Sequence, residues 1–232
     1  MILRHKRVRG FTLTELAIVI GVIGILTAAI WTFIGPAYEN TRHQQLAEQL
    51  STVVNHVRAL YAGQAGISGA AATLTPQLVT QGAIPTNTVR SGAGGCTNNN
   101  NICVDGPWGP GGGTNSATAI ASGSLGVCDW TAGVPAGANC ATQPNSLTSQ
   151  FFAVELRGLS FASCVVIAPQ NSASGAPPGL LDVVINGVSI MGAPGVVAHS
   201  LPVQFGDAKN LCNSGPGGNT VDFVYRLQQP AY

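Results

Sequence analysis

A run of nineteen residues without a charge, Leu16 to Ile34, constrains this chain more than any other feature. As an α-helix rising about 1.5 Å per residue, it is about 28 Å long and matches the hydrocarbon thickness of a bilayer. Four basic residues precede it, at Arg4, Lys6, Arg7 and Arg9. Positive charge on one side of a membrane segment keeps that side cytoplasmic. The sequence therefore predicts a single membrane helix with the rest of the chain outside.

A cleaved secretory signal is a weaker interpretation, since the run is too long and no small-x-small cleavage site follows it. A lone glutamate, Glu15, stands directly before the run. A carboxylate in hydrocarbon costs about 2.5–3.5 kcal/mol, so such residues usually serve a function with a partner. The simpler alternative places Glu15 at the interface, where it reaches water. No cationic side chain follows until Arg42, so we expect its partner to lie outside the chain as written.

A periodic apolar stripe continues beyond the uncharged run. Its members are Leu46, Leu50, Val53, Val54, Val57, Leu60 and Tyr61. Their spacing of three and four residues is typical of an amphipathic helix that packs on a globular domain. We therefore expect one helix from Phe11 to about Ala62, with Gly35-Pro36 as a point where it could bend.

The remainder of the chain has few charges. Charged residues make up 8% of the sequence, against about 25% in an average domain. Four of the ten basic residues lie in the first ten positions, so six basic residues face nine acidic ones elsewhere. This balance leaves no basic patch and argues against a nucleic-acid partner. Six cysteines without a Cys-x-x-Cys pair favour disulfides in an oxidising compartment over a zinc site or free buried thiols.

The stretch GFTLTEL, Gly10 to Leu16, resembles the processing site of type IV prepilins and related pseudopilins. The resemblance implies that a prepilin peptidase cuts between Gly10 and Phe11 and that Phe11 becomes N-methylated. Glu15 would then be the fifth residue of the mature chain. In this family that glutamate is thought to pair with the N-terminal amine of a neighbouring subunit during assembly, so the implied partner of Glu15 is the new amine on a neighbour's Phe11.

One departure from the family pattern concerns a proline. Many pilins carry proline at the twenty-second mature residue, which here is Thr32, whereas Pro36-Ala37-Tyr38 comes four residues later. The kink associated with that proline is therefore expected to be displaced or absent.

Landmarks after the helix resemble type IVb pilins. Residues 75–82 are expected to form a short helix with Thr75 as N-cap, Pro76 in the first turn and Gly82 as the stop. Gly82-Ala83-Ile84-Pro85 follows, and Asp105-Gly106-Pro107-Trp108-Gly109 would be the turn that opens the sheet.

The C-terminal half is expected to be mostly strands. Residues 151–156 alternate partly, 180–186 end in an Asn-Gly turn, and 220–227 alternate as a half-buried strand. The apolar run 162–168 could be a strand or part of a helix. By resemblance, Cys164 and Cys212 match the pair that encloses the D-region of type IVb pilins. The simplest pairing of the others is Cys96 with Cys103 and Cys128 with Cys140, although six cysteines allow fifteen connectivities.

No catalytic constellation is visible. The triple glycine at 111–113 lacks a Gly-Lys-Ser/Thr ending, and His199 beside Ser200 has no nucleophile-elbow context. His43 and His56 are expected on the helix surface, and the acids are scattered singly, unlike a calcium loop. The run Asn98–Asn101 is expected to be an exposed loop that could bind a ligand such as a sugar. We therefore expect no cofactor, no metal and no enzymatic activity.

These observations predict an α+β pilin fold, in which a long N-terminal helix packs on an antiparallel β-sheet head. The expected parts are a removed leader (1–10), a transmembrane and filament-core helix (11–36), an amphipathic half (37–66) and a disulfide-containing head (67–232). The expected function is a structural subunit of a type IV pilus, held in the inner membrane and then assembled into an extracellular filament. Its partners would be itself, the prepilin peptidase, the inner-membrane assembly platform and a possible cell-surface receptor. The alternatives are a minor or tip pilin with adhesive loops, a type II secretion pseudopilin and, more distantly, a membrane-anchored enzyme.

Overall fold

The computed structural model describes residues 12–69, 71–91, 102–107, 125–130, 149–173, 176–191, 200–213 and 218–228. The chain forms two compact units, Met1–Thr41 and Arg42–Tyr232, and the second unit is called the head below.

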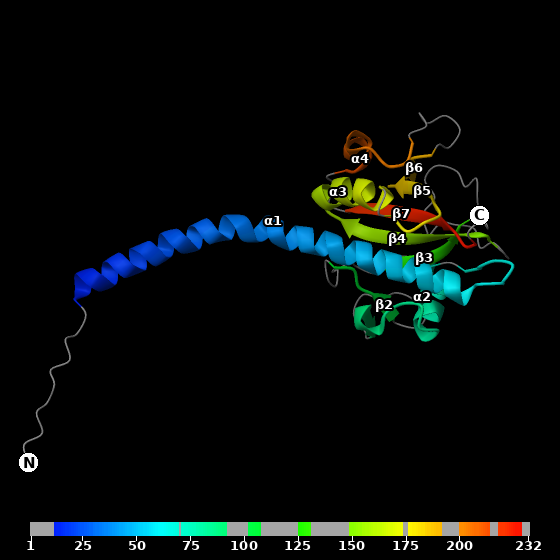
Figure 1. Cartoon of the computed structure of the whole chain (residues 1–232), viewed down its shortest axis with the longest axis horizontal. Helices are drawn as coiled ribbons and strands as arrows, with labels where there is room; N and C mark the ends of the chain where they lie inside the picture. The colour runs from blue at the N-terminus through cyan, green and yellow to red at the C-terminus, as the bar shows by residue number, and fades with distance from the viewer. Residues whose placement is uncertain are drawn as a thin grey trace, which may run out of the picture. The chain divides into compact units, whose positions relative to one another are not determined.

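Helix α1 (Leu13–Leu60) has 48 residues and crosses the boundary between the two units (Figure 1). It begins after Thr12 and ends before Gly63, whose φ of +81° suits a residue without a side chain. The expected long helix is confirmed to within two residues at each end. Its backbone remains α-helical through Gly35 and Pro36, so the displaced proline does not break the helix.

A five-stranded antiparallel sheet forms the centre of the head. Its spatial order is β3 (Leu125–Trp130), β4 (Phe151–Leu159), β7 (Asn219–Arg226), β5 (Leu180–Ile185) and β6 (Val188–Ser189). Strand β7, the last of the described strands in sequence, therefore lies between β4 and β5. A separate two-stranded sheet pairs β1 (Val89–Ser91) with β2 (Ile102–Val104), just after the short 3-10 helix η1 (Thr86–Thr88).

The amphipathic half of α1 covers one face of the five-stranded sheet. Leu46, Leu50, Val53, Val54 and Val57 are fully buried in one cluster with sheet side chains of β4 and β7. Because burial of such a side chain contributes about 1.5–3 kcal/mol, this stripe attaches α1 firmly to the head. The predicted amphipathic stripe is confirmed.

Helix α2 (Ala71–Thr80) begins four residues earlier than expected. Gly82, with φ of +76°, ends it as predicted, and the amide of Ala83 donates to the carbonyl of Leu78. The expected N-cap at Thr75 is wrong. The Thr75 hydroxyl lies inside the helix and bonds instead to the backbone of Val127 in β3, accepting from its N–H at 2.9 Å and donating to its carbonyl at 3.2 Å.

Helix α3 (Phe161–Ser172) resolves the ambiguity over residues 162–168 in favour of a helix. The Ser160 side chain caps it by accepting a bond from the amide of Ser163. Helix α4 (Phe205–Leu211) contacts α3, and the disulfide Cys164–Cys212 joins the two regions across 48 residues. The cysteine pair implied by the resemblance is confirmed.

The expected hairpin at Asn186-Gly187 is confirmed. Both residues have positive φ, 51° and 81°, as a two-residue hairpin turn requires. Strand β7 differs from the expectation of a half-buried strand, because both of its faces are buried. On the face away from α1, Val224 packs with Cys128, Trp130, Ala153 and Val184.

Candidate assembly site along the first helix

The N-terminal turn of α1 contains a reciprocal hydrogen-bonded pair. The backbone N–H and the hydroxyl of Thr12 donate to Glu15 Oε2 at 2.9 and 2.8 Å, and the amide of Glu15 lies 3.3 Å from the Thr12 hydroxyl oxygen. This is a capping box, in which a threonine before the helix and a glutamate three residues later satisfy each other's groups. Glu15 therefore has a neutral partner within the chain, Thr12, and its expected cationic partner on a neighbouring copy stays a prediction.

The pattern Thr-x-x-Glu was visible in the sequence as a helix-start signal. This pattern pairs a carboxylate with a neutral hydroxyl, so the positions of the cations in the sequence do not reveal it. Both bonds from Thr12 end on Oε2, and no bond to Oε1 occurs within the described part of α1. One carboxylate oxygen of Glu15 therefore remains available.

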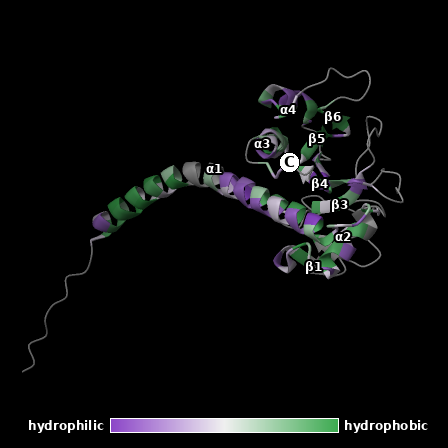
Figure 2. Ribbon diagram, turned by 45° about the vertical axis from the view of Figure 1, so that its right-hand side comes forward, coloured by the Kyte–Doolittle hydropathy of each residue, from purple (hydrophilic) through white to green (hydrophobic). Residues whose placement is uncertain are grey.

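The first half of α1 presents an exposed apolar surface (Figure 2). Residues Leu13–Ile30 are long and apolar enough to cross a membrane, and none of them is buried. The large exposed side chains are Leu13, Leu16, Ile18, Val19, Ile20, Val22, Ile23, Ile25, Leu26 and Ile30. Soluble monomers rarely expose a continuous apolar surface of this extent, so this segment needs lipid or other protein around it.

The other expected processing residues, Gly10 and Phe11, lie outside the described residues. Among the cysteines, Cys128 is disulfide-bonded, and no described cysteine is free. Cys96 and Cys140 lie outside the described residues, as do the asparagine run 98–101 and the triple glycine, so the expected pairings Cys96–Cys103 and Cys128–Cys140 stay predictions.

The C-terminal end of the stripe is anchored to the sheet by Arg58. Its Nε donates to the carbonyl of Arg226 at 3.0 Å, and its guanidinium carbon lies 5.7 Å from the centre of the Tyr225 ring. Partial burial lowers the pKa of Arg58, and burial raises the pKa of Tyr225. These contacts fix α1 to the central strand β7.

The segment enclosed by the disulfide is held by two asparagines that the sequence did not single out. Asn219 is fully buried and donates to the carbonyls of Leu159 and Asn213 at 3.1 and 2.9 Å. It also accepts from the amide of Asn213 at 2.7 Å and from the side chain of Asn186 at 2.9 Å. No short-range pattern identifies this role, because the partners come from distant parts of the chain.

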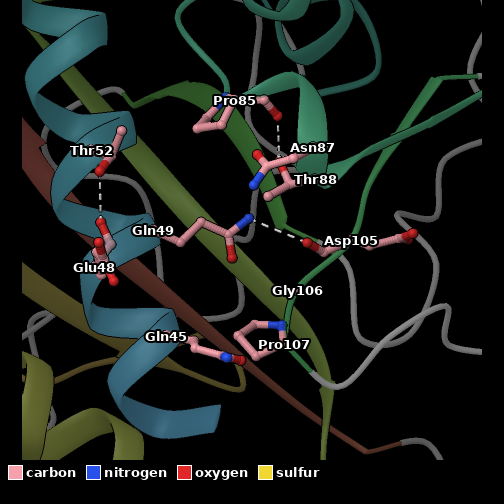
Figure 3. Close-up of a pocket in the computed structure, with 10 residues that line it drawn as sticks. All are labelled: Gln45, Glu48, Gln49, Thr52, Pro85, Asn87, Thr88, Asp105, Gly106 and Pro107. Carbon is pink, nitrogen blue, oxygen red and sulfur yellow. Dashed lines mark hydrogen bonds between the residues drawn. The ribbon is translucent and has the colours of Figure 1, made fainter. Parts of the chain in front are cut away.

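A polar pocket of about 440 Å³ lies where α1 meets η1 and the end of β2 (Figure 3). Its lining residues are Gln45, Glu48, Gln49, Thr52, Pro85, Asn87, Thr88, Asp105, Gly106 and Pro107. The Gln49 amide crosses to the carbonyl of Asp105 at 3.2 Å, and the Asp105 amide donates to the carbonyl of Thr88 at 2.7 Å. These bonds fix the walls of the pocket.

The histidines and acids do not assemble into a metal site in the described ranges, where no group of three or more His, Cys, Asp or Glu side chains could hold an ion. His56 remains at the surface, with Nδ1 3.1 Å from the carbonyl of Ala83. The surface expectation for His43 is wrong, since that side chain is buried in the head. His199, considered above beside Ser200, lies outside the described residues.

The sequence pattern of the family described as "Prokaryotic N-terminal methylation motif" matches residues 5–31. No curated protein sequence matches the chain at a significant level.

Several solved pilin structures are similar to this chain. A crystal structure of a type IVb pilin from Salmonella typhi is 18% identical, covers 79% of this chain and 98% of its own, and has a TM-score of 0.50. A crystal structure of TcpA, a type IV pilin from Vibrio cholerae El Tor biotype, is 14% identical over 79% and 98% of the two chains, with a TM-score of 0.46. An NMR structure of the type IVb pilin PilS from Salmonella typhi is 21% identical over 84% and 98%, with a TM-score of 0.36.

The assignment of the fold rests on the first of these structures and on the helix and sheet described above. This chain therefore carries the N-terminal methylation motif of prokaryotic prepilins and has the fold of the type IVb pilins.

Proposed function

We propose that this protein is a structural subunit of a type IV pilus, made as a membrane-held precursor and assembled into a filament by bundling of its first helix. One observation carries the proposal: the methylation motif at residues 5–31 includes the apolar first half of α1, Leu13–Ile30, which is exposed along its length. The apolar surface of such a helix can be buried in the lipid bilayer before assembly and against the same helix of other copies after assembly. The head, with its low charge and its disulfide, forms the outer shell.

Processing is proposed to cut between Gly10 and Phe11 and to methylate the new amine of Phe11. Removal of residues 1–10 deletes the basic cluster, which would be costly to bury in a filament core. It also creates a cation four residues before Glu15. The Thr12 cap supports a refined role for the carboxylate, in which Oε2 stays with Thr12 while Oε1 meets the amine of a neighbouring copy. In a packed bundle the low dielectric strengthens such a pair.

The proposal is tested on fibres sheared from cells that make the protein. Electron microscopy combined with mass spectrometry should show filaments whose dominant chain begins at methylated Phe11. Filaments in which the chain is sparse would indicate a minor or tip subunit instead. Loss of exported enzymes on deletion, with surface fibres unchanged, would indicate a secretion pseudopilin.

The role of Glu15 is tested separately. Glu15→Ala should leave cleavage after Gly10 intact and abolish filaments, because the proposed pair with a neighbour's amine forms only during assembly. Normal filaments from this variant would contradict the pairing. Glu15→Gln is the matched control for shape: it can still accept from Thr12 but lacks the charge, so it should also fail to assemble.

A further inference from the structure

Charged side chains on the surface of the head are few and unevenly distributed. Among the charged residues of the head whose exposure the structure describes, two are exposed to solvent: Glu48 and Lys209. The others are buried or half-buried. The two exposed side chains carry opposite charges.

Glu48 and Lys209 lie on opposite sides of the head. Glu48 lines the pocket formed by α1, η1 and the end of β2. Lys209 belongs to the last turn of α4, which packs on α3 and lies on the other side of α1 from β2 (Figure 1). Figure 2 shows the same separation from a second direction. The two side chains therefore cannot pair within one copy of the chain.

Glu48 lies in a recess of the surface of the head. Glu48 lines the polar pocket described above, whose volume of about 440 Å³ admits more than one side chain. The amides of Gln45, Gln49 and Asn87 line it as well, so a cation that enters meets hydrogen-bond acceptors besides the carboxylate (Figure 3). The described residues of the lining include two carboxylates, Glu48 and Asp105, and no basic side chain.

Lys209 and Phe205 are two exposed side chains of α4, and together they are called the projection below. Phe205 is 61% exposed and lies four residues before Lys209 on α4, so the ring and the ammonium share one side of that helix. Asp207 lies two residues from Lys209, and side chains with that spacing do not face each other on a helix. The projection therefore presents one aromatic ring and one positive charge.

We propose that Lys209 of one copy inserts into the Glu48 pocket of the next copy, with Phe205 packed at the pocket rim. This inference rests on the proposed function, since it names the contact between heads in the filament. Different surfaces of the two copies meet, so the contact is heterologous and repeats without closing, as a helical filament requires. In a head with so few exposed charges, this pair also fixes which surfaces meet, because the wrong pairing would bring like charges together.

The test is a charge swap in the full chain, expressed in cells that assemble filaments. Glu48→Lys alone and Lys209→Glu alone should each reduce the yield of sheared filaments by at least about tenfold, because each brings like charges together in every repeat. The double variant, Glu48→Lys with Lys209→Glu, should restore the yield to within about twofold of the original.

Matched controls place the same charges nearby. Asn55→Lys puts a cation on the same side of α1, two turns further along and outside the pocket. Asn210→Glu puts an anion on the exposed surface of α4 beside Lys209. Both should assemble normally. Each variant should also accumulate as membrane-held precursor to the same level as the original chain, which shows that it folds.

Two results would overturn the contact. One is normal assembly by either single charge reversal, and the other is failure of the double variant when both singles fail. Both are distinct from failure of the proposed function, in which the unaltered chain would be missing from the filaments.

Discussion

The side-chain nitrogen of Asn186 lies 2.9 Å from the side-chain oxygen of Asn219, and the same nitrogen lies 2.8 Å from the carbonyl of Leu211. Through these contacts the β5–β6 turn, the start of β7 and the end of α4 are joined at one point. Asn219 extends the network to Leu159 at the end of β4. The disulfide closes the segment covalently, and the two asparagines fix its ends relative to the sheet.

Removal of the Asn219 side chain should therefore weaken the head strongly. Asn219→Ala leaves several buried partners without a hydrogen bond, and we expect a loss of about 2–4 kcal/mol in the free energy of unfolding. Urea unfolding of the full chain in detergent, followed by near-UV circular dichroism, measures the change. Asn210→Ala, at an exposed position of α4, should stay within about 0.5 kcal/mol. Equal effects from the two variants would contradict the role given to Asn219.

Gly218 should not tolerate a side chain. A Cβ there would lie 2.8 Å from the Cα of Gly158, which sits at the β-bulge of β4, and φ is +69° at both glycines. Gly218→Ala combines a steric clash with a strained backbone, so we expect destabilisation of at least about 2 kcal/mol. The matched change Gly206→Ala meets nothing within 4 Å and lies in α4, where alanine is the better helix former. The same unfolding measurement should show Gly206→Ala to be neutral or stabilising.

The sequence predicted the elements that depend on local pattern. The stripe of α1 was evident because buried positions recur every three or four residues among polar ones. Helix α3 remained ambiguous because its run FASCVVIA is apolar on nearly all sides, so no periodicity separates helix from strand. Thr75 was misassigned because its hydroxyl bonds to β3, a tertiary partner that the local capping pattern does not contain.

The contacts of the candidate site also fall into two groups: local contacts, which the sequence pattern can predict, and long-range contacts, which it cannot. The Thr12–Glu15 pair lies within three residues, and the pattern Thr-x-x-Glu is sufficient to predict it from the sequence. The Asn219 network could not, since it joins residues up to 60 positions apart. The burial of both faces of β7 could not be predicted from the sequence for a related reason. The alternation of apolar and polar residues suggests that the face with Asp222 is exposed, but Asp222 is fully buried.

The head should lose stability as the pH rises. Glu155 lies directly opposite Asp222 across β4 and β7, both are fully buried, and Arg157 is the cation paired with Glu155, at 2.5 Å. Burial raises the pKa of Glu155 above its ordinary value of 4.5, although Arg157 opposes the shift. Between the unfolded and folded pKa values the folded chain binds more protons, so the free energy of unfolding falls as pH increases through that window.

Urea unfolding at pH 5, 6.5 and 8 measures this dependence. Glu155→Gln removes the titrating group and should reduce the slope of stability against pH, whatever its effect at a single pH. Identical slopes in the variant and the original chain would show that Glu155 does not titrate in this window.

Thr12 should matter for the start of α1. Thr12→Ala removes the hydroxyl that bonds to Glu15, and loss of such a cap costs about 0.5–2 kcal/mol of local helix stability. Hydrogen exchange of the amides of residues 13–16, measured on the precursor in detergent, should accelerate about threefold or more. Thr12→Ser keeps the cap and should exchange like the original chain. Unchanged exchange in Thr12→Ala would show that the capping box does not stabilise this turn.

The position of β7 governs the order in which the head can be completed. Strands β4 and β5 make no ladder with each other, because each pairs with β7, and β7 comes last in sequence among the described strands. Until residues 219–226 arrive, the sheet exists only as two separate halves, and α1 has no continuous surface on which to pack. A chain that stops before Asn219 can therefore form the pairs β3–β4 and β5–β6 but lacks the strand that joins them. The head can close only after residues 219–226 have been made, so a head with a complete sheet reports that synthesis has passed β7.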